Sequence, residues 1–152
     1  MIGSGTVLDT ARLKCMLGGE LGVDARSVHA FIIGEHGDSE LAVFSSANVS
    51  GIDLRDFYDM CQPDEYQDDT ERIYDQVKDS AYKIIESKKA TYFGVAMAVC
   101  RICECIMRNE HSILTVSGVV EGQYGASDMA LSLPCIVGCL LYTSPSPRDR
   151  SV

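Results

Sequence analysis

The sequence lacks any window of about 18 uninterrupted apolar residues, so we expect no membrane-spanning helix. Its N-terminus also lacks the basic region and apolar core of an export signal. Basic residues are scarce, with 13 Lys and Arg against 22 Asp and Glu and a net charge of −9. Such a charge repels phosphate backbones and anionic membrane surfaces. We therefore predict a soluble, cytoplasmic protein that binds neither nucleic acid nor membranes.

The cysteine pattern lacks the marks of a disulfide framework and of a metal site. The seven cysteines are odd in number and are spread through helix-like and strand-like segments. Cys100, Cys103 and Cys105 lie close together, but no second Cys or His pair stands at a spacing that would complete four ligands. We expect reduced thiols and no metal.

The sequence is also without a Gly-x-Gly-x-x-Gly segment after a predicted strand, so we expect no dinucleotide-binding half in this chain. The remaining patterns predict one α+β domain over residues 1–141, in which strand hairpins pack on long helices. Residues 142–152 contain clustered arginines and prolines without periodicity, and are expected to form a disordered, non-native tail. The expected helices are 7–17, 54–60 and two within 70–109, meeting near 87–94; the expected strands are 28–33, 41–46, 112–120 and 129–137.

The first expected helix carries a pair of opposite charges. Thr6 can cap this helix, and Gly18 and Gly19 are expected to end it. Asp9 and Arg12 are three residues apart and so share a helix face. The pair is either a surface ion pair or a carboxylate and a guanidinium offered to one site. Arginine suits an anionic substrate because its planar fork binds a carboxylate through two parallel hydrogen bonds.

A polar link with two glycines, residues 34–40, joins two expected strands. It presents His36 between Glu35 and Asp38. Histidine can both give and take a proton near neutral pH, although a histidine in an acidic turn is also an ordinary surface feature. Further along, Thr91 stands at the junction of the two long helices, where a threonine is commonly a cap.

Three separated motifs, residues 2–12, 28–39 and 90–94, occur in an order that resembles the catalytic half of the lactate/malate dehydrogenase family. The resemblance covers about residues 2–139 and is greatest to the bacterial, cytosolic L-lactate dehydrogenases. Malate dehydrogenases share the aspartate and arginine motif but typically carry a different residue where this chain has Glu35. The resemblance implies an L-lactate dehydrogenase catalytic domain that interconverts pyruvate and L-lactate with NAD as the cofactor.

The resemblance also implies roles for individual residues. His36 would give a proton to the substrate carbonyl or take one from its hydroxyl, and Asp9 would orient the imidazole and stabilise its protonated form. Arg12 would hold the substrate carboxylate, and Thr91 would contact the substrate. Ser4 would touch the nicotinamide amide.

Regulation and assembly are further implications of the resemblance. Bacterial relatives bind fructose 1,6-bisphosphate between subunits through a basic residue and a histidine, and the parent enzyme is a homotetramer. His29 matches the histidine, while Lys14 stands where arginine is usual. Lysine keeps the charge but loses the fork, so we expect weaker allosteric binding. His29 is equally well explained as a strand histidine with local partners.

The chain departs from the family pattern at both ends. The mobile-loop arginine that polarises the substrate carbonyl and the residue that selects lactate over malate belong to the half we expect to be missing. After Val137 and Gly138 the family would continue into a strand and a final helix, so we expect truncation there too. We expect the chain alone to be inactive and poorly soluble. The alternatives are a malate dehydrogenase type of 2-hydroxy acid dehydrogenase, or a non-catalytic oligomerisation or regulatory fragment.

Overall fold

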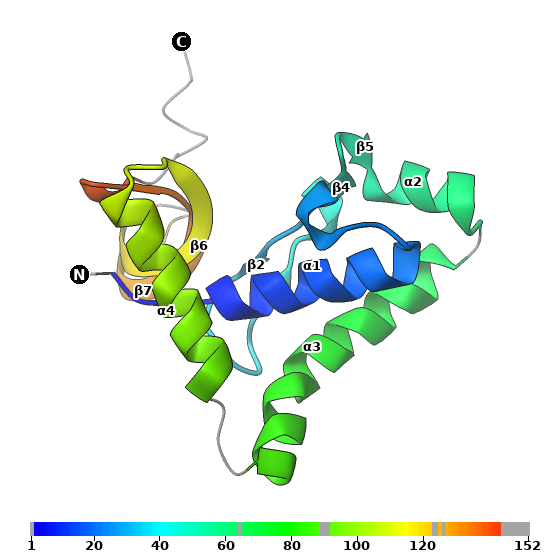
Figure 1. The fold of residues 1–152 in the computed structure, drawn as a ribbon, viewed down its shortest axis with the longest axis horizontal. Helices are drawn as coiled ribbons and strands as arrows, with labels where there is room; N and C mark the ends of the chain where they lie inside the picture. The colour runs from blue at the N-terminus through cyan, green and yellow to red at the C-terminus, as the bar shows by residue number, and fades with distance from the viewer. Residues whose placement is uncertain (1, 64, 89–91, 123–124, 126, 144–152) are drawn as a thin grey trace. The chain divides into compact units, whose positions relative to one another are not determined.

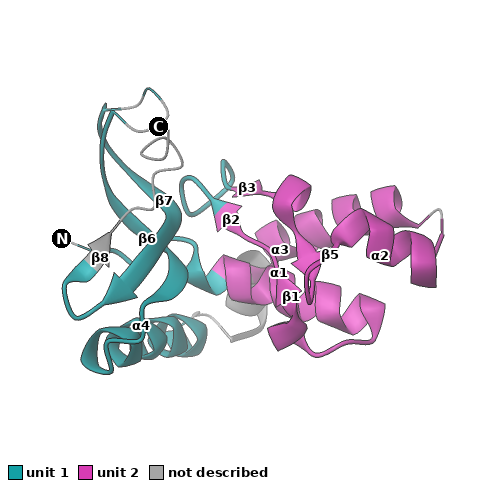
Figure 2. Ribbon diagram, turned by 90° about the horizontal axis from the view of Figure 1, so that it is seen from above, with its two compact units in different colours: residues 1–8, 33–40, 92–152 teal, residues 9–32, 41–91 magenta. Residues whose placement is uncertain are grey.

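The computed structural model describes residues 2–63, 65–88, 92–122, 125 and 127–143. Their contacts divide the chain into two compact units that are interleaved in sequence (Figure 2). Unit 1 contains residues 1–8, 33–40 and 92–152, and unit 2 contains residues 9–32 and 41–91. The chain passes between the two units at 8/9, 32/33, 40/41 and 91/92.

The long helices follow the predicted order (Figure 1). They are α1 (Val7–Leu21), α2 (Leu54–Cys61), α3 (Tyr66–Lys88) and α4 (Tyr92–Met107). The predicted division of residues 70–109 into two helices is confirmed, and Asp68 and Asp69 occupy the first turn of α3, where negative charge is favourable. Among the described residues, no helix combines the length and apolar character that crossing a membrane requires.

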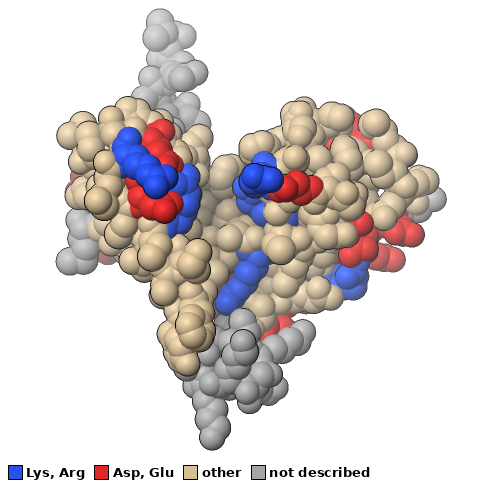
Figure 3. Space-filling model, in the orientation of Figure 1, with Lys and Arg blue, Asp and Glu red and all other residues tan. Residues whose placement is uncertain are grey.

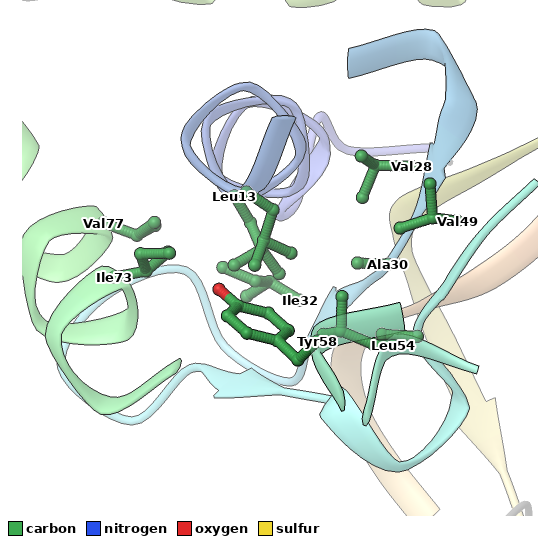
Figure 4. Packing of buried hydrophobic residues seen from close by; sticks show 11 residues of the cluster. Leu13, Val28, Ala30, Ile32, Val49, Leu54, Tyr58, Ile73 and Val77 are labelled. Atoms are coloured by element: carbon green, nitrogen blue, oxygen red, sulfur yellow. The ribbon is translucent and has the colours of Figure 1, made fainter. Parts of the chain in front are cut away.

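Unit 2 is built on three helices around one apolar core (Figure 4). Helix α1 buries Leu13 and Leu17 completely, one turn apart, and α3 buries Ile73 and Val77 at the same spacing. Tyr58 of α2 enters the same core with no exposed surface. The other buried members of this cluster are Val28, Ala30, Ile32, Ala47, Val49 and Leu54.

Helix α1 does not stop at its two consecutive glycines, which corrects the prediction. It ends where Gly22 adopts a left-handed φ of 66°, and the amide of Val23 donates to the carbonyl of Gly18 over 2.8 Å. A Cβ on Gly18 would lie 2.8 Å from the carbonyl oxygen of Val23. After the helix ends, the backbone at Val23 therefore packs directly against Gly18, where a side chain would not fit.

The expected strand over 28–33 is two short strands in different sheets. Strand β1 (Val28–His29) pairs with β4 (Asn48–Val49), which pairs with β5 (Ile52–Asp53), while β2 (Ile32–Ile33) pairs with β3 (Leu41–Ala42). The chain has changed its pairing partner by Phe31, whose carbonyl accepts from the amide of Val43 over 2.9 Å. The predicted strand 41–46 ends early, because Phe44–Ser46 close a 3₁₀ turn; Ala25–Ser27 form another.

Unit 1 is centred on a long antiparallel hairpin of β6 (Ser112–Glu121) and β7 (Ser127–Gly138), which confirms the predicted pair. The third strand, β8 (Leu141–Thr143), pairs with the end of β7 and includes the first two residues of the expected tail. Residues 144–152 lie outside the described residues. Pro134 stands opposite Thr115, and β8 begins its pairing two residues later, at Ile136, so proline occupies a stretch where its missing N–H breaks no bond to β8.

Helix α4 packs one face on this hairpin, and its opposite face is exposed. Ala98, Ile102 and Cys105 join the unit 1 core, whereas Phe93 is 73% and Met97 70% exposed. Nearly all residues of α4 are apolar, but only one side of the helix meets a packed partner within the described part of unit 1.

Acidic and basic side chains are interspersed on the face drawn in Figure 3. Among the described residues, Arg72 pairs with Glu20 and Arg101 pairs with Glu110.

Candidate active site

Asp9 and Arg12 form the predicted pair on α1, within unit 2. Nη1 of Arg12 donates to Oδ1 of Asp9 over 3.2 Å, and the two side chains are 15% and 3% exposed. Because the contact uses one guanidinium nitrogen, and no other hydrogen bond engages Arg12 in the described part of the chain, the rest of the fork can bind an anionic group. The pair is therefore better shielded than the surface ion pair that the spacing also allowed.

Thr10 links this helix to the strand that precedes the histidine loop. Its hydroxyl accepts from the amide of Ile32 over 3.0 Å and donates to the carbonyl of the same residue over 3.4 Å. A side chain next to Asp9 thus satisfies the backbone of a fully buried strand residue. Sequence reasoning missed Thr10, because a threonine inside a helix pattern carries no local signal of a distant backbone partner.

The loop of residues 34–40 lies in unit 1 and presents His36 on its exposed part, as predicted. Gly34 and Gly37 adopt φ values of 95° and 142°, which residues other than glycine rarely adopt. The two glycines therefore allow the chain to turn sharply on either side of His36. The hydroxyl of Ser39 donates to Oε2 of Glu35 over 2.8 Å. Glu35 is therefore engaged in shaping the loop.

Backbone bridges attach both functional segments of unit 1 to the same point of the hairpin. Gly34 and Ser132 exchange two backbone hydrogen bonds of 2.9 and 2.8 Å, and Gly3 and Ser117 exchange two of 2.9 and 3.0 Å. Ser117 and Ser132 are themselves partners across β6 and β7. The segment before Ser4 and the segment before His36 are thus fixed in one continuous ladder.

Ser4 lies at the start of α1, where its carbonyl accepts from the amide of Val7 over 3.2 Å and its side chain is exposed. The next residue, Gly5, has a φ of 50°, and a Cβ there would lie 2.5 Å from Oγ of Ser132 and 2.8 Å from the amide of Ser117. Glycine is therefore required for the chain to approach the hairpin this closely.

Glu40 is a buried carboxylate that sequence reasoning did not single out. It is 4% exposed at the end of the loop, and one of its oxygens lies within 4.8 Å of a ring nitrogen of His36. Its position directly before the strand Leu41–Ala42 resembles that of any polar loop residue, so composition alone gave no signal of its burial.

The candidate allosteric residues Lys14 and His29 both belong to unit 2, and no hydrogen bond joins them among the residues with described side chains. Lys14 is half-buried, and burial lowers the pKa of its ammonium group. His29 is an exposed residue of strand β1, opposite Asn48. Thr91 lies outside the described residues.

The structure therefore joins Asp9 to Arg12 within unit 2, and holds the segments of Ser4 and His36 on one hairpin within unit 1. Residues 6–140 match the model of the lactate/malate dehydrogenase, alpha/beta C-terminal domain. The chain belongs to the lactate/malate dehydrogenase family. The expected fold class, the C-terminal domain of that family, is confirmed.

Comparison with individual relatives agrees with this family assignment. The chain is 57% identical over 138 residues to an L-lactate dehydrogenase of Acetivibrio thermocellus and 52% identical over 139 residues to one of Moorella thermoacetica; each match covers 91% of this chain and 44% of the relative. A minor L-lactate dehydrogenase from Enterococcus mundtii in the ligands-bound form superposes with a TM-score of 0.87 at 40% identity, covering 94% of this chain and 45% of that one. The chain thus spans less than half the length of these relatives.

Proposed function

We propose that this chain is the catalytic part of a NAD-dependent L-lactate dehydrogenase that interconverts pyruvate and L-lactate. The observation that carries the proposal is the shielded Asp9–Arg12 pair, in which one guanidinium nitrogen meets the aspartate and the rest of the fork is open to a second anion. A carboxylate fits that fork through two parallel hydrogen bonds, and pyruvate and lactate both carry one. Arg12 therefore binds and orients the substrate.

His36 transfers the proton. An imidazole is the side chain best matched to giving a proton to a developing alkoxide and taking it back near neutral pH. Support comes from its exposed place between two glycines on a loop anchored to β7 by Gly34. In the proposal, Asp9 orients the imidazole and stabilises its protonated form, as the family resemblance implies. Thr91 contacts the substrate on the same basis.

The cofactor contact of this chain is Ser4. When bound, NADH supplies the hydride that reduces the carbonyl carbon. The exposed hydroxyl of Ser4 stands at the start of α1, beside backbone fixed by the Gly3–Ser117 bridge, and a hydroxyl can both donate to and accept from a carboxamide. These features fit a contact with the nicotinamide amide. In the proposal, most of the cofactor site comes from a dinucleotide-binding part, and the Ser4 contact comes from this chain.

Regulation and assembly extend the proposal. Lys14 and His29 supply two cationic or proton-binding groups in unit 2 for fructose 1,6-bisphosphate at an interface between subunits of a cytoplasmic homotetramer. Lys14 presents a single ammonium charge in place of a fork, so we expect weaker bisphosphate binding than an arginine gives. Replacing Lys14 by arginine should tighten bisphosphate activation, measured as a lower activator concentration at half effect.

The test is to join this chain to the part of a relative that the match does not cover. Joining this chain to the N-terminal part of the Acetivibrio thermocellus L-lactate dehydrogenase should give NADH-dependent reduction of pyruvate, whereas the chain alone should give none. Arg12→Lys in the restored enzyme should raise the KM for pyruvate at least about tenfold, because the fork is lost. A folded, assembled chimera without pyruvate reduction would favour the non-catalytic alternative.

The malate alternative needs a second donor, because the N-terminal half carries the residues that select the substrate in this family. Joined to the N-terminal part of a malate dehydrogenase, the chain should reduce oxaloacetate with a lower kcat/KM than the first chimera shows for pyruvate. The reverse order would assign the chain to the malate enzymes.

A further inference from the structure

A cleft in unit 1 lies away from the segments that carry Ser4 and His36. Its volume is about 390 Å³, which is within the range of small-molecule sites. The link between α4 and β6 forms one wall, and the end of β7 with its turn into β8 forms the other. The apolar part of the lining consists of Ile136, Leu140 and Leu141. Leu140 is 84% and Leu141 44% exposed, so the cleft holds apolar surface that a ligand would remove from water.

Hydrogen bonds determine which ring nitrogen of His111 carries a proton at this cleft. Oδ1 of Asn109 accepts from the backbone amide of Cys139 over 2.9 Å, and this donor identifies the oxygen of the Asn109 side chain. Nε2 of His111 lies 2.9 Å from the same oxygen, so Nε2 carries a proton and donates it. In the neutral ring, Nδ1 is therefore an acceptor, and no hydrogen bond engages it within the described residues.

The backbone around the cleft is unusual. His111 and Leu141 adopt left-handed φ values of 57° and 74°, which are uncommon for residues other than glycine. Gly138, the partner of Leu141 across β7 and β8, leaves room for the polar pair, since a Cβ there would lie 2.8 Å from Oδ1 of Asn109. The same Cβ would lie 2.8 Å from Cδ2 of His111. Rare backbone conformations gather at binding sites, and two of the lining residues have them.

The lining selects the chemistry of a ligand. Apolar walls favour an apolar body, and Nδ1 of His111 accepts from a hydrogen-bond donor. Neither Lys nor Arg lines the described cleft, so an anion would find no fixed positive charge there. We propose that the cleft binds a small, uncharged, mostly apolar molecule with one hydroxyl group, such as a phenol, whose hydroxyl donates to Nδ1 of His111. The inference concerns unit 1 alone and is independent of the proposed catalytic function.

The first test uses the unmodified chain and two probes that share one ring. Cys139 lines the cleft and is exposed, so a bound ligand should shield its thiol from iodoacetamide. Phenol should bind with a dissociation constant on the order of 1 mM and at saturation slow the alkylation of Cys139 at least about fivefold, but not that of Cys15 in unit 2. Anisole, which has a methyl ether in place of the O–H, should bind at least about threefold more weakly. Absence of protection, or equal binding of the two probes, would overturn the proposal.

Two variants separate the hydrogen bond from the apolar walls, and slow alkylation of the buried Cys105 checks that each is folded. His111→Phe keeps a ring but removes Nδ1, so phenol and anisole should bind equally, within about twofold. Leu140→Ala should weaken both probes at least about threefold, while phenol keeps its advantage. The matched control is Leu41→Ala, which removes a leucine of unit 2 that is 56% exposed and should leave both affinities unchanged. A phenol advantage that survives His111→Phe, or unchanged affinities in Leu140→Ala, would contradict the proposal.

Discussion

The two units hold their candidate catalytic residues by different means. In unit 1 the His36 loop and the Ser4 segment are attached by backbone bridges, from Gly34 to Ser132 and from Gly3 to Ser117. In unit 2 the hydroxyl of Thr10 hydrogen-bonds the helix that carries Asp9 and Arg12 to the backbone of β2. Backbone attachment tolerates changes of side chain but demands close approach, whereas side-chain attachment depends on the chemistry of one residue. The two units should therefore fail under different substitutions.

The largest expected effect follows from adding a single methyl group to the backbone-attached segment. Gly5→Ala should destabilise the protein by about 3 kcal/mol, because it combines overpacking against the hairpin with a left-handed φ. The added Cβ would lie 2.5 to 2.8 Å from atoms of Ser132, Ser117 and Thr115. Chemical denaturation measures the loss. Gly122→Ala is the control, since Gly122 also has a positive φ, 97°, but a Cβ there would meet no atom of the described residues within 4 Å, and it should cost about 1 kcal/mol.

The side-chain attachment should break when the Thr10 hydroxyl is removed. Thr10→Val removes the two hydrogen bonds that the Thr10 hydroxyl makes with the backbone of the buried Ile32, and should cost about 2 kcal/mol. Thr10→Ser keeps the hydroxyl and should cost clearly less. By contrast, Ser117→Ala in unit 1 should change stability by no more than about 0.5 kcal/mol, because the Gly3 bridge uses only its backbone. Equal losses for Thr10→Val and Ser117→Ala would remove the distinction between the units.

These attachments mark the limit of what the sequence could predict. Helix α2, the division between α3 and α4, and the hairpin β6–β7 follow from periodicity and turn residues, and the Asp9–Arg12 contact follows from helix spacing. Strands β1 and β2 were predicted as one strand, and β4 and β5 were not predicted, because a stretch of two residues has no periodicity to read.

The buried polar residues escaped prediction for a related reason. The burial of Glu40 and the partner of Thr10 depend on segments far away in the sequence, and no local pattern encodes them. Gly18 was misread because a glycine near a helix end can belong either to the last turn or to the stop, and only the fold-back of Val23 decides between them.

The rate at which cysteine thiols are alkylated provides another comparison of the two units. Both cysteines of unit 2, Cys15 and Cys61, are exposed, whereas unit 1 buries Cys105 and Cys135. Burial raises the pKa of both of those thiols, so less of the reactive thiolate forms at neutral pH. Iodoacetamide should alkylate Cys15 and Cys61 at least about tenfold faster, as followed by mass spectrometry of peptides. Rapid labelling of Cys105 in the native protein would show that the unit 1 core opens more readily than its packing implies.

The smallest expected effect concerns acid. Hydrogen bonds lower the pKa of Glu110 in unit 1, chiefly the one from Arg101, and lower the pKa of Asp24 in unit 2 to about 2, chiefly the one from Arg26. A lowered pKa contributes stability above the unfolded-state value, and this stability is lost as the pH falls through the folded-state value.

The two carboxylates differ in what their bonds connect. Glu110 also accepts from Ser112 and so links the end of α4 to β6, whereas Asp24 bonds only within its own turn. Glu110→Gln should flatten the fall in stability between about pH 4 and pH 2 more than Asp24→Asn does, as measured by denaturant titrations across that range. A larger effect from Asp24→Asn would reverse the comparison.

The most direct test of the account is the turnover of the restored enzyme with His36→Asn. Asparagine is close in size and polar but cannot transfer the proton, so kcat for pyruvate reduction should fall by about 10²- to 10⁴-fold while NADH binding, followed by fluorescence, stays within about twofold. A kcat within a few-fold of the parent chimera, with NADH binding intact, would contradict the assignment of His36 as the proton donor.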